Sequence, residues 1–211
     1  MFINIIVLIS SLGNSIFTFD GTVNTIIDLT TTLQCVQGNN PRSISFMIQT
    51  TYTGGSACVM GTGFGTTATG SAFGVTFSGS GGMNGVIGVD AYYVYNFPTT
   101  GKAINDGLWH SVLVIYDGTT VSIYVDGRLD NTATNWNIYS TATISSTLNT
   151  VGNSGNYLGQ WIDGGYRWIG KLKNVLFYDY VITNTYALAN NYQSAGNILY
   201  NSGNGNNYLK Y

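Results

Sequence analysis

The sequence predicts an all-β protein, an antiparallel two-sheet β-sandwich with one short helix near the C-terminus. Runs of strand-forming residues follow one another at short, even intervals, and no longer internal repeat is visible. The 211-residue chain has 28 Gly and only 2 Pro, and 44% of its residues are hydrophobic. Such values are typical of one folded domain with many short strands, and they argue against disorder. We therefore expect residues 1–211 to form a single domain.

The glycine-rich stretch from Gly54 to Gly85 is interpreted as strands joined by turns. It contains Gly61-Thr62-Gly63-Phe64-Gly65, which superficially matches a nucleotide-binding loop. Such a loop needs a helix after it to direct backbone amides at phosphates, and here the strand-type residues Phe73, Val75 and Phe77 follow. Turns and edge bulges are the better interpretation.

The clearest strand signals lie between Asp106 and Asp130. Trp109 to Tyr116 is apolar on both faces, whereas Val121 to Asp126 alternates between apolar and polar residues. Alternation of period two predicts a strand with one buried face. Asp117-Gly118 and Asp126-Gly127 predict tight turns, because these residue types accept positive φ angles. The segment is therefore predicted to be the centre of an antiparallel sheet.

The C-terminal third is predicted to hold one strand at about Leu148–Val151, a long loop from Asn153 to Arg167, and a short helix. Thr183 can cap this helix, which we expect to run through Tyr192, although Tyr186 stands where a capping box has Glu. The tail after Gly196 is rich in Gly and Asn and is predicted to contain a loop and a last strand.

Three further segments extend the strand pattern to both ends of the chain: Phe17–Gly21, Ile44–Thr50 and Gly170–Asp179. With the Trp-His start and the Tyr-Val-Asp-Gly turn of the central segment, they closely resemble the laminin-G-like domains of the concanavalin A-like lectin/glucanase superfamily. The resemblance covers about residues 16–193 in the right order, and it implies a jelly-roll sandwich. Met47 stands where the family usually has an aromatic residue. This fold carries lectins, glycan hydrolases, adhesion modules and structural domains alike, so function must be argued separately.

Charge is scarce in this chain. Charged residues make up 8% of the sequence, about a third of the usual share, and the net charge is −2. Asn, Ser, Thr and Tyr must then supply solubility, which suits an extracellular, cell-surface or virion-surface protein. This net charge provides no basic surface for binding nucleic acid and no basic helix for binding a membrane.

The apolar start, Met1–Ile9, has three interpretations. It is interrupted only by Asn4, and no Lys or Arg precedes Arg42, so a signal peptide is a weaker interpretation than a first strand or an oligomer contact. No other segment approaches the length of a membrane span, and we expect no membrane insertion.

Cys35 and Cys58 are the only thiols. They either form a disulfide or are two buried small hydrophobic residues, and the second reading is favoured. Together with the single histidine, His110, they are too few for an ordinary zinc site.

Catalysis is not expected. All nine acidic residues are Asp, whereas the superfamily's retaining glucanases carry two Glu about an Asp on one strand. Their reaction needs a nucleophile and an acid about 5 Å apart. A Ser or Cys nucleophile would need His110 as its base. His110 follows Trp109 directly, and the simpler interpretation is that it orders its own strand. A hydrolase would require Asp residues in an unfamiliar arrangement.

No cofactor is expected either. The resemblance implies a calcium ion at the rim, held by an Asp that enters the strand at about Ser71–Phe77. The sequence has no Asp between Asp28 and Asp90, so the inherited site is predicted to be missing, since Ca²⁺ binds poorly without a carboxylate. Asp163 with loop carbonyls offers a different metal site, but a solvated turn is the simpler role.

Carbohydrate recognition needs exposed aromatic rings and a few polar groups. Two loop regions that bracket the predicted strand near residue 150 carry such residues and are predicted to meet at one rim. The predicted binding residues are Trp136, Tyr139, Trp161, Asp163 and Tyr166. Many other aromatic residues, such as Trp109 and Trp168, are expected to be core or subunit contacts.

These observations predict a non-catalytic, lectin-like surface module that binds glycans or glycoproteins in carbohydrate recognition or cell adhesion. The alternative is a structural surface or virion protein that assembles with copies of itself, because a low-charge surface rich in Tyr and Asn suits self-packing. A glycan hydrolase is the second alternative.

Overall fold

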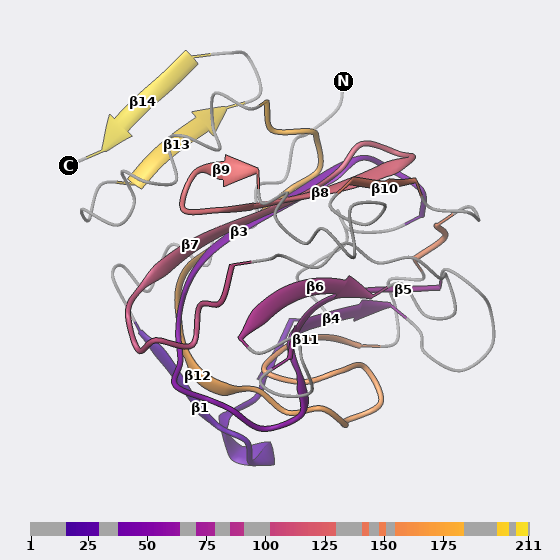
Figure 1. The fold of residues 1–211 in the computed structure, drawn as a ribbon. Helices are drawn as coiled ribbons and strands as arrows, with labels where there is room; N and C mark the ends of the chain where they lie inside the picture. The colour runs from indigo at the N-terminus through magenta and orange to yellow at the C-terminus, as the bar shows by residue number, and fades with distance from the viewer. Residues whose placement is uncertain are drawn as a thin grey trace.

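The structure of the chain is a computed structural model. It describes residues 16–29, 38–63, 71–78, 85–90, 102–129, 141–143, 148–150, 155–183, 198–202 and 206–210. Within these ranges twelve strands form two sheets that lie face to face, and the last two strands pair with each other in a separate two-stranded sheet (Figure 1). All pairs of neighbouring strands are antiparallel. The predicted antiparallel two-sheet β-sandwich is confirmed.

The seven-stranded sheet, called the large sheet below, has the order β1 (Phe17–Asp20), β12 (Ile169–Tyr178), β3 (Arg42–Gln49), β7 (His110–Tyr116), β8 (Thr120–Val125) and β10 (Thr141–Thr143), and β9 (Arg128–Leu129) also pairs with β8. The five-stranded small sheet has the order β2 (Ile27–Asp28), β11 (Asn156–Leu158), β4 (Ser56–Gly63), β5 (Ala72–Ser78) and β6 (Val86–Asp90). A short 3-10 turn, η2 (Val23–Thr25), follows β1, and β13 (Ile198–Ser202) pairs with β14 (Asn206–Lys210).

The core lies between the two sheets. Alternate residues of β3, namely Ile44, Phe46 and Ile48, are buried there, as the two-residue period of a strand requires. Trp168 is 0% exposed and meets Phe77 of the small sheet edge to face, with ring centroids 5.1 Å apart. Trp168 is thus a core residue, as expected from the sequence.

The outer face of the large sheet is also partly covered. Leu113 and Tyr124 on this face form a second apolar cluster with Ile182, which follows β12. The Ser43 hydroxyl fastens this segment, because it donates to the Tyr180 carbonyl and accepts from the Ile182 amide, both at 2.9 Å. Strand β7 is therefore buried on both faces, as its continuous apolar run predicts.

Asp-Gly pairs form the predicted tight turns. The Asp126-Gly127 pair has φ angles of +51° and +76° and joins β8 to β9. In four other Asp-Gly pairs the aspartate accepts a hydrogen bond from the backbone amide two residues later, which is the Asx turn. These four aspartates are Asp20, Asp106, Asp117 and Asp163.

Three details differ from the predictions. In the described part of the expected strand at 148–151, Thr150 makes only an isolated bridge to Gly38. The expected loop from Asn153 to Arg167 contains β11, because its residues pair with both β4 and β2. Trp109 is not a core residue but is partly exposed on the outer face of the large sheet, beneath the Lys173 ammonium, so of its two expected roles only that of a subunit contact stays a prediction.

Several predictions fall outside the described residues and stay predictions: the roles of Met1–Ile9 and of the helix after Thr183. Cys58 is buried, with its Sγ 3.6 Å from the Val75 carbonyl oxygen. Cys35 lies outside the described residues, so the proposed disulfide also stays untested. The described residues include no helix with the length and apolar character needed to cross a membrane.

Candidate functional site

The structure describes three of the five residues predicted to bind carbohydrate: Trp161, Asp163 and Tyr166. The other two, Trp136 and Tyr139, lie outside the described residues and remain predictions. Whether the two predicted loops meet at one rim is therefore not tested.

The described loop between β11 and β12 is closed by a 2.8 Å hydrogen bond from the Trp168 amide to the Gly159 carbonyl. It lies against the outer face of the small sheet. The Cys58 amide of β4 donates to the Tyr166 carbonyl, and a Cβ atom at Gly61 would lie only 3.0 Å from the Gln160 carbonyl oxygen. The loop backbone thus contacts the strand directly.

Trp161 is buried in this arrangement, with 6% of its surface exposed. Its ring packs with Cys58 and Ala72 and covers Gly74, where a Cβ atom would overlap the indole. The expected exposure of Trp161 is therefore wrong, because Gly74 in β5 leaves space that the ring fills and Gly61 in β4 lets the loop backbone approach the strand. Carbohydrate binding by Trp161 stays a prediction and would require the loop to move.

Asp163 and Tyr166 lie on the solvent side of the same loop. The Asp163 carboxylate accepts from the Gly165 amide at 2.9 Å, so the residue shapes a turn, as its simpler interpretation held. Tyr166 has a φ angle of +49° and is 62% exposed. The loop therefore offers one exposed aromatic ring next to an exposed carboxylate.

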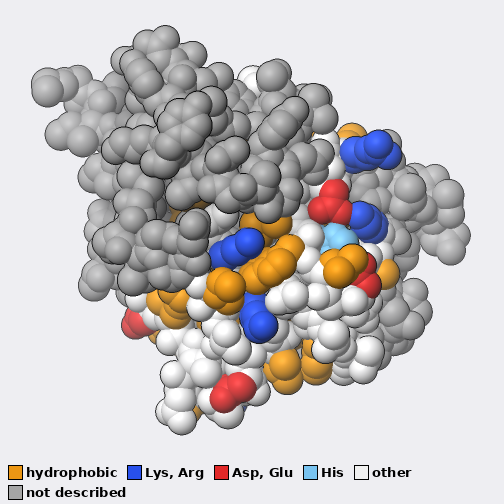
Figure 2. Space-filling view, turned by 90° about the vertical axis from the view of Figure 1, so that its left-hand side faces the viewer, with side chains coloured by type: hydrophobic (Ala, Val, Ile, Leu, Met, Phe, Trp, Pro, Cys, Tyr) orange, Lys and Arg blue, Asp and Glu red, His pale blue; other side chains and the backbone are white. Residues whose placement is uncertain are grey.

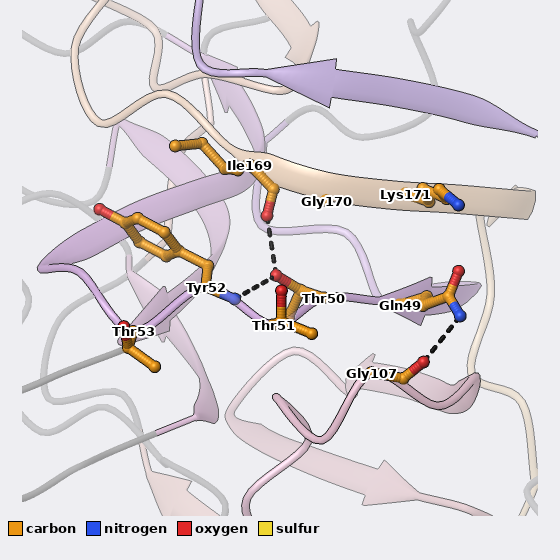
Figure 3. Close-up of a pocket in the computed structure, with 9 residues that line it drawn as sticks. All are labelled: Gln49, Thr50, Thr51, Tyr52, Thr53, Gly107, Ile169, Gly170 and Lys171. Atoms are coloured by element: carbon orange, nitrogen blue, oxygen red, sulfur yellow. Dashed lines mark hydrogen bonds between the residues drawn. The ribbon is translucent and has the colours of Figure 1, made fainter.

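A pocket of about 540 Å³ opens elsewhere, at one end of the large sheet (Figure 3). Its walls come from residues 49–53 at and after the end of β3, from Gly107 in the turn before β7, and from residues 169–171 at the start of β12. Lys171 is paired directly opposite Gln49. The pocket thus forms where β3 leaves the sheet while its neighbour β12 enters.

Hydrogen bonds hold the three segments together. The Thr50 hydroxyl donates to the Ile169 carbonyl at 2.8 Å and accepts from the Tyr52 amide at 2.9 Å. The Gly107 amide donates to the Thr50 carbonyl at 3.0 Å, and the Gln49 side-chain amide donates to the Gly107 carbonyl at 2.7 Å. The walls are therefore fixed before any ligand binds, which lowers the entropic cost of binding.

The groups left accessible are mainly uncharged. Thr51 and Thr53 are exposed, and Figure 3 shows the Gln49 side-chain oxygen directed away from Gly107, toward the strand that carries Lys171. Ile169 is 39% exposed. The pocket combines hydroxyl groups, an amide oxygen, an apolar side chain and one ammonium.

Gly170 keeps this wall of the pocket shallow. A Cβ atom at this position would lie 2.6 Å from the Trp168 ring and 2.8 Å from the Gln49 carbonyl oxygen, so no side chain fits. The packing of a core tryptophan thus explains why glycine separates the two side chains that β12 presents at the pocket.

The pocket is suited to binding rather than to proton transfer. None of its nine lining residues is a carboxylate, an imidazole or a thiol. The Asx turns described above occupy four of the described aspartates. Across the part of the chain that the structure describes, no group of three or more His, Cys, Asp or Glu residues is placed to hold a metal ion.

One charged cluster adjoins the turn that contributes Gly107 to the pocket. The buried His110 ring has its Nδ1 2.9 Å from Asp126 Oδ2 and its Nε2 3.0 Å from Asp106 Oδ1. Lys102 also contacts the Asp126 carboxylate, and the Ser111 amide donates to it at 3.0 Å. Because Asp106 precedes Gly107, the cluster fixes the turn that forms one wall of the pocket. His110 therefore orders its surroundings, in line with the sequence interpretation.

The cluster changes the acidity of both carboxyl groups. The His110 hydrogen bond, followed by the bond from the Leu108 amide, lowers the pKa of Asp106. Burial alone would raise the pKa of Asp126, but hydrogen bonds from Lys102, His110 and the Ser111 backbone outweigh it, so this pKa is also lowered. Both groups are therefore held in the ionised form.

Sequence reasoning missed the pocket. Its side chains are ordinary polar residues, and Thr50 and Ile169 are 119 positions apart. The one available signal was the run Thr50-Thr51-Tyr52-Thr53, which begins at the last residue of a predicted strand. Such a run places several hydroxyl groups at the end of a sheet, where ligand-binding loops commonly lie.

Comparisons with known proteins agree with the fold. A family model described as the concanavalin A-like lectin/glucanases superfamily matches residues 20–186. No curated protein sequence matches the chain.

Several solved structures are similar. CBM40 of the Ruminococcus gnavus IT-sialidase, bound to α2,3 sialyllactose, has a TM-score of 0.64 at 15% identity, and the match covers 84% of this chain and 95% of that one. Domain 4 of AbnA, a GH43 extracellular arabinanase from Geobacillus stearothermophilus, in complex with arabinotriose, has a TM-score of 0.53 at 14% identity, with 74% and 68% covered. The NanB sialidase from Streptococcus pneumoniae (K499G mutant) has a TM-score of 0.62 at 14% identity, with 83% of this chain covered and only 27% of the sialidase. This chain therefore spans about a quarter of that enzyme, and at these identities the likeness establishes the fold alone.

Proposed function

Because the chain belongs to the concanavalin A-like lectin/glucanase superfamily, we propose that it is a non-catalytic carbohydrate-binding module that acts outside the cell or at a cell surface. One observation carries the proposal. The pocket at the end of the large sheet presents pre-positioned hydrogen-bonding groups and an apolar side chain, without a carboxylate among its lining residues.

The chemistry of the pocket suits a saccharide. Sugar hydroxyls both donate and accept hydrogen bonds, and the hydroxyls of Thr51 and Thr53 and the side-chain oxygen of Gln49 match them. The exposed Ile169 side chain can cover the apolar face of a sugar ring. Binding sites of this kind place a few convergent polar groups beside apolar surface. The CBM40 and AbnA domains, whose structures hold sialyllactose and arabinotriose, add support from the same fold.

A hydrolytic role has less support. Retaining glycosidases place two carboxyl groups about 5 Å apart across the scissile bond, and inverting enzymes leave a somewhat wider gap. The chain contains no Glu, and the two carboxylates Asp106 and Asp126 are bridged by the His110 ring rather than facing each other across an open cleft. This arrangement favours a structural role for these three residues over a catalytic one.

The proposal is tested with a broad glycan array, probed with the purified protein in the presence and absence of millimolar calcium. We expect binding to a related set of glycans that is independent of calcium. The double variant Thr51→Ala/Thr53→Ala should lose this binding while it keeps the thermal stability of the wild type, since both residues are exposed.

Two further variants make the test specific. Arg128→Gln changes an exposed residue on β9 and serves as the control that should bind normally. Tyr166→Ala tests the loop on the small sheet, and loss of binding in this variant alone would assign the site to the loop. Silence of the wild type under both conditions would refute the proposal and favour the self-assembling structural role, which light scattering would then examine.

A further inference from the structure

We propose that the pocket continues onto the outer face of the large sheet as a subsite for an acidic sugar unit, bound by Lys171 and Lys173 beside Trp109. This inference rests on the proposed carbohydrate binding and names the class of its ligand: a saccharide that carries a carboxylate or a sulfate.

The strand register places these side chains in one patch. Lys171 pairs with Gln49 and Lys173 pairs with Met47 on the neighbouring strand β3. The β3–β7 register, continued by one residue, sets Trp109 opposite Gln49. Residues two apart on a strand share a face and lie about 7 Å apart, and neighbouring strands are about 5 Å apart. The two ammonium groups, the Gln49 amide and the Trp109 indole therefore share one face of the large sheet, and two of these residues, Gln49 and Lys171, also line the pocket.

The Lys173 ammonium lies 4.5 Å from the centre of the Trp109 ring. Both side chains are partly exposed, and Met47 beside them is fully buried. A cation held over an aromatic face in this way is restrained in position. It can therefore meet an incoming anion with less loss of side-chain entropy than a freely moving surface lysine.

The charge of this patch is unusual for the protein. The chain has only seven Lys and Arg residues and a net charge of −2, yet two of the seven stand at alternate positions of one strand. No ion pair found among the described residues involves Lys171 or Lys173. On the adjoining strand β1, the Asp20 carboxylate accepts from the Thr22 amide. Among the described residues the patch is thus locally positive, with Lys171 exposed and Lys173 partly exposed.

Figure 2 shows one face of the molecule with its side chains coloured by type. Basic side chains are set among hydrophobic ones there, and the single histidine, with acidic side chains beside it, lies to one side. Positive charge next to apolar surface matches an acidic sugar, whose ring has apolar faces and whose acidic group needs a cation. A neutral sugar would leave both ammonium groups without a counter-charge.

The test compares acidic oligosaccharides with their methyl esters, which keep the size and ring shape but remove the charge. Oligogalacturonate and sialyllactose, each with its ester, are titrated into the full chain by calorimetry. We expect at least one acid to bind about tenfold more tightly than its ester, because charge-assisted hydrogen bonds are about twice as strong as neutral ones. This preference should shrink as salt rises from about 0.05 M to 0.5 M, since ions screen exposed charges.

The variant Lys171→Gln/Lys173→Gln should abolish the preference for the acid, while Arg128→Gln, which removes one exposed cation elsewhere, should keep it. Trp109→Phe keeps an aromatic face and should retain most of the preference. Far-UV circular dichroism is the control that checks whether each variant is folded.

The possible failures are distinguishable. If the esters bind as tightly as the acids, or if the lysine variant keeps the preference, the acidic subsite is refuted while carbohydrate binding stands. If only neutral glycans bind on the array, the subsite is refuted in the same way. If no glycan of any kind binds, the proposed function itself fails, and the subsite with it.

Discussion

Replacing Trp161 by Ala should destabilise the folded protein, and it should not remove carbohydrate binding from a protein that is still fully stable. The side chain is 6% exposed and fills the space above Gly74, between Cys58 and Ala72. It therefore belongs to the packing of the small sheet rather than to an open binding surface. The substitution removes most of the apolar contact between the loop and the sheet.

The magnitude follows from the buried area. A buried aromatic side chain removes about 150–250 Å² from water. At ~25 cal/mol per Å² this corresponds to roughly 4–6 kcal/mol. Compact unfolded chains already bury part of this area, and a surface loop can relax toward the sheet, so we expect a loss of about 3 kcal/mol, at the low end for such substitutions.

Gly74→Ala provides an independent route to the same contact. Its new Cβ atom would displace the Trp161 ring, so the single variant should also lose stability. In the Trp161→Ala background the Cβ atom has space, apart from a 3.0 Å approach to the Met60 carbonyl oxygen, and the added cost should be small. The double-mutant cycle should therefore show a coupling of about 1 kcal/mol or more.

Urea unfolding followed by tryptophan fluorescence and circular dichroism measures all three variants. Tyr166→Ala, in the same loop but 62% exposed, is the matched control and should change stability by less than about 0.5 kcal/mol. The reasoning is refuted if Trp161→Ala unfolds at the wild-type urea concentration but no longer binds glycans, since the ring would then be an exposed stacking platform.

Three other predictions concern the rest of the fold. The pKa values of Asp106 and Asp126 are lowered in the folded state, so the stability that these groups contribute is present above about pH 4 and is lost as the pH falls through their folded-state pKa values. His110→Gln should therefore weaken the dependence of stability on pH in urea titrations from pH 5 to pH 2. An unchanged dependence of stability on pH would contradict this prediction. Arg42 is fully buried between aromatic rings and makes several hydrogen bonds. Arg42→Ala should therefore lower the free energy of unfolding by about 3 kcal/mol or more, and a loss below about 1 kcal/mol would show that the polar contacts of Arg42 are weak. Gly127 has a φ of +76°, which strains any residue with a Cβ atom. Gly127→Ala should therefore lower the melting temperature by several degrees, and calorimetry that finds no change would argue against this turn geometry.

Much of the fold could be predicted because its signals are local. Alternation in Val121–Asp126 and the continuous apolar run to Tyr116 depend only on which faces of a strand are buried. Asp126-Gly127 predicts its hairpin because few other residue pairs accept two positive φ angles. The family resemblance added three further strands in their order along the chain, and the structure confirms them as β1, β3 and β12.

The candidate site could not be predicted in the same way. Trp161 lies in the loop where the sequence places it, but its burial depends on Gly74 in a different strand. The pocket depends on Lys171 lying opposite Gln49 and on the Thr50 hydroxyl reaching Ile169, contacts between distant parts of the chain. The run of hydroxyl residues from Thr50 to Thr53 is the one local signal in those segments, and it does not show which other segments complete the pocket.

The sequence by itself therefore determined most of the strands, the Asp-Gly turns and the absence of Glu that argues against a glucanase. Only the tertiary structure decided which aromatic rings are buried and which polar residues share a pocket. The physical reason is that strand period and turn chemistry act over a few residues, whereas exposure and convergence depend on sheet register and packing between segments more than a hundred positions apart.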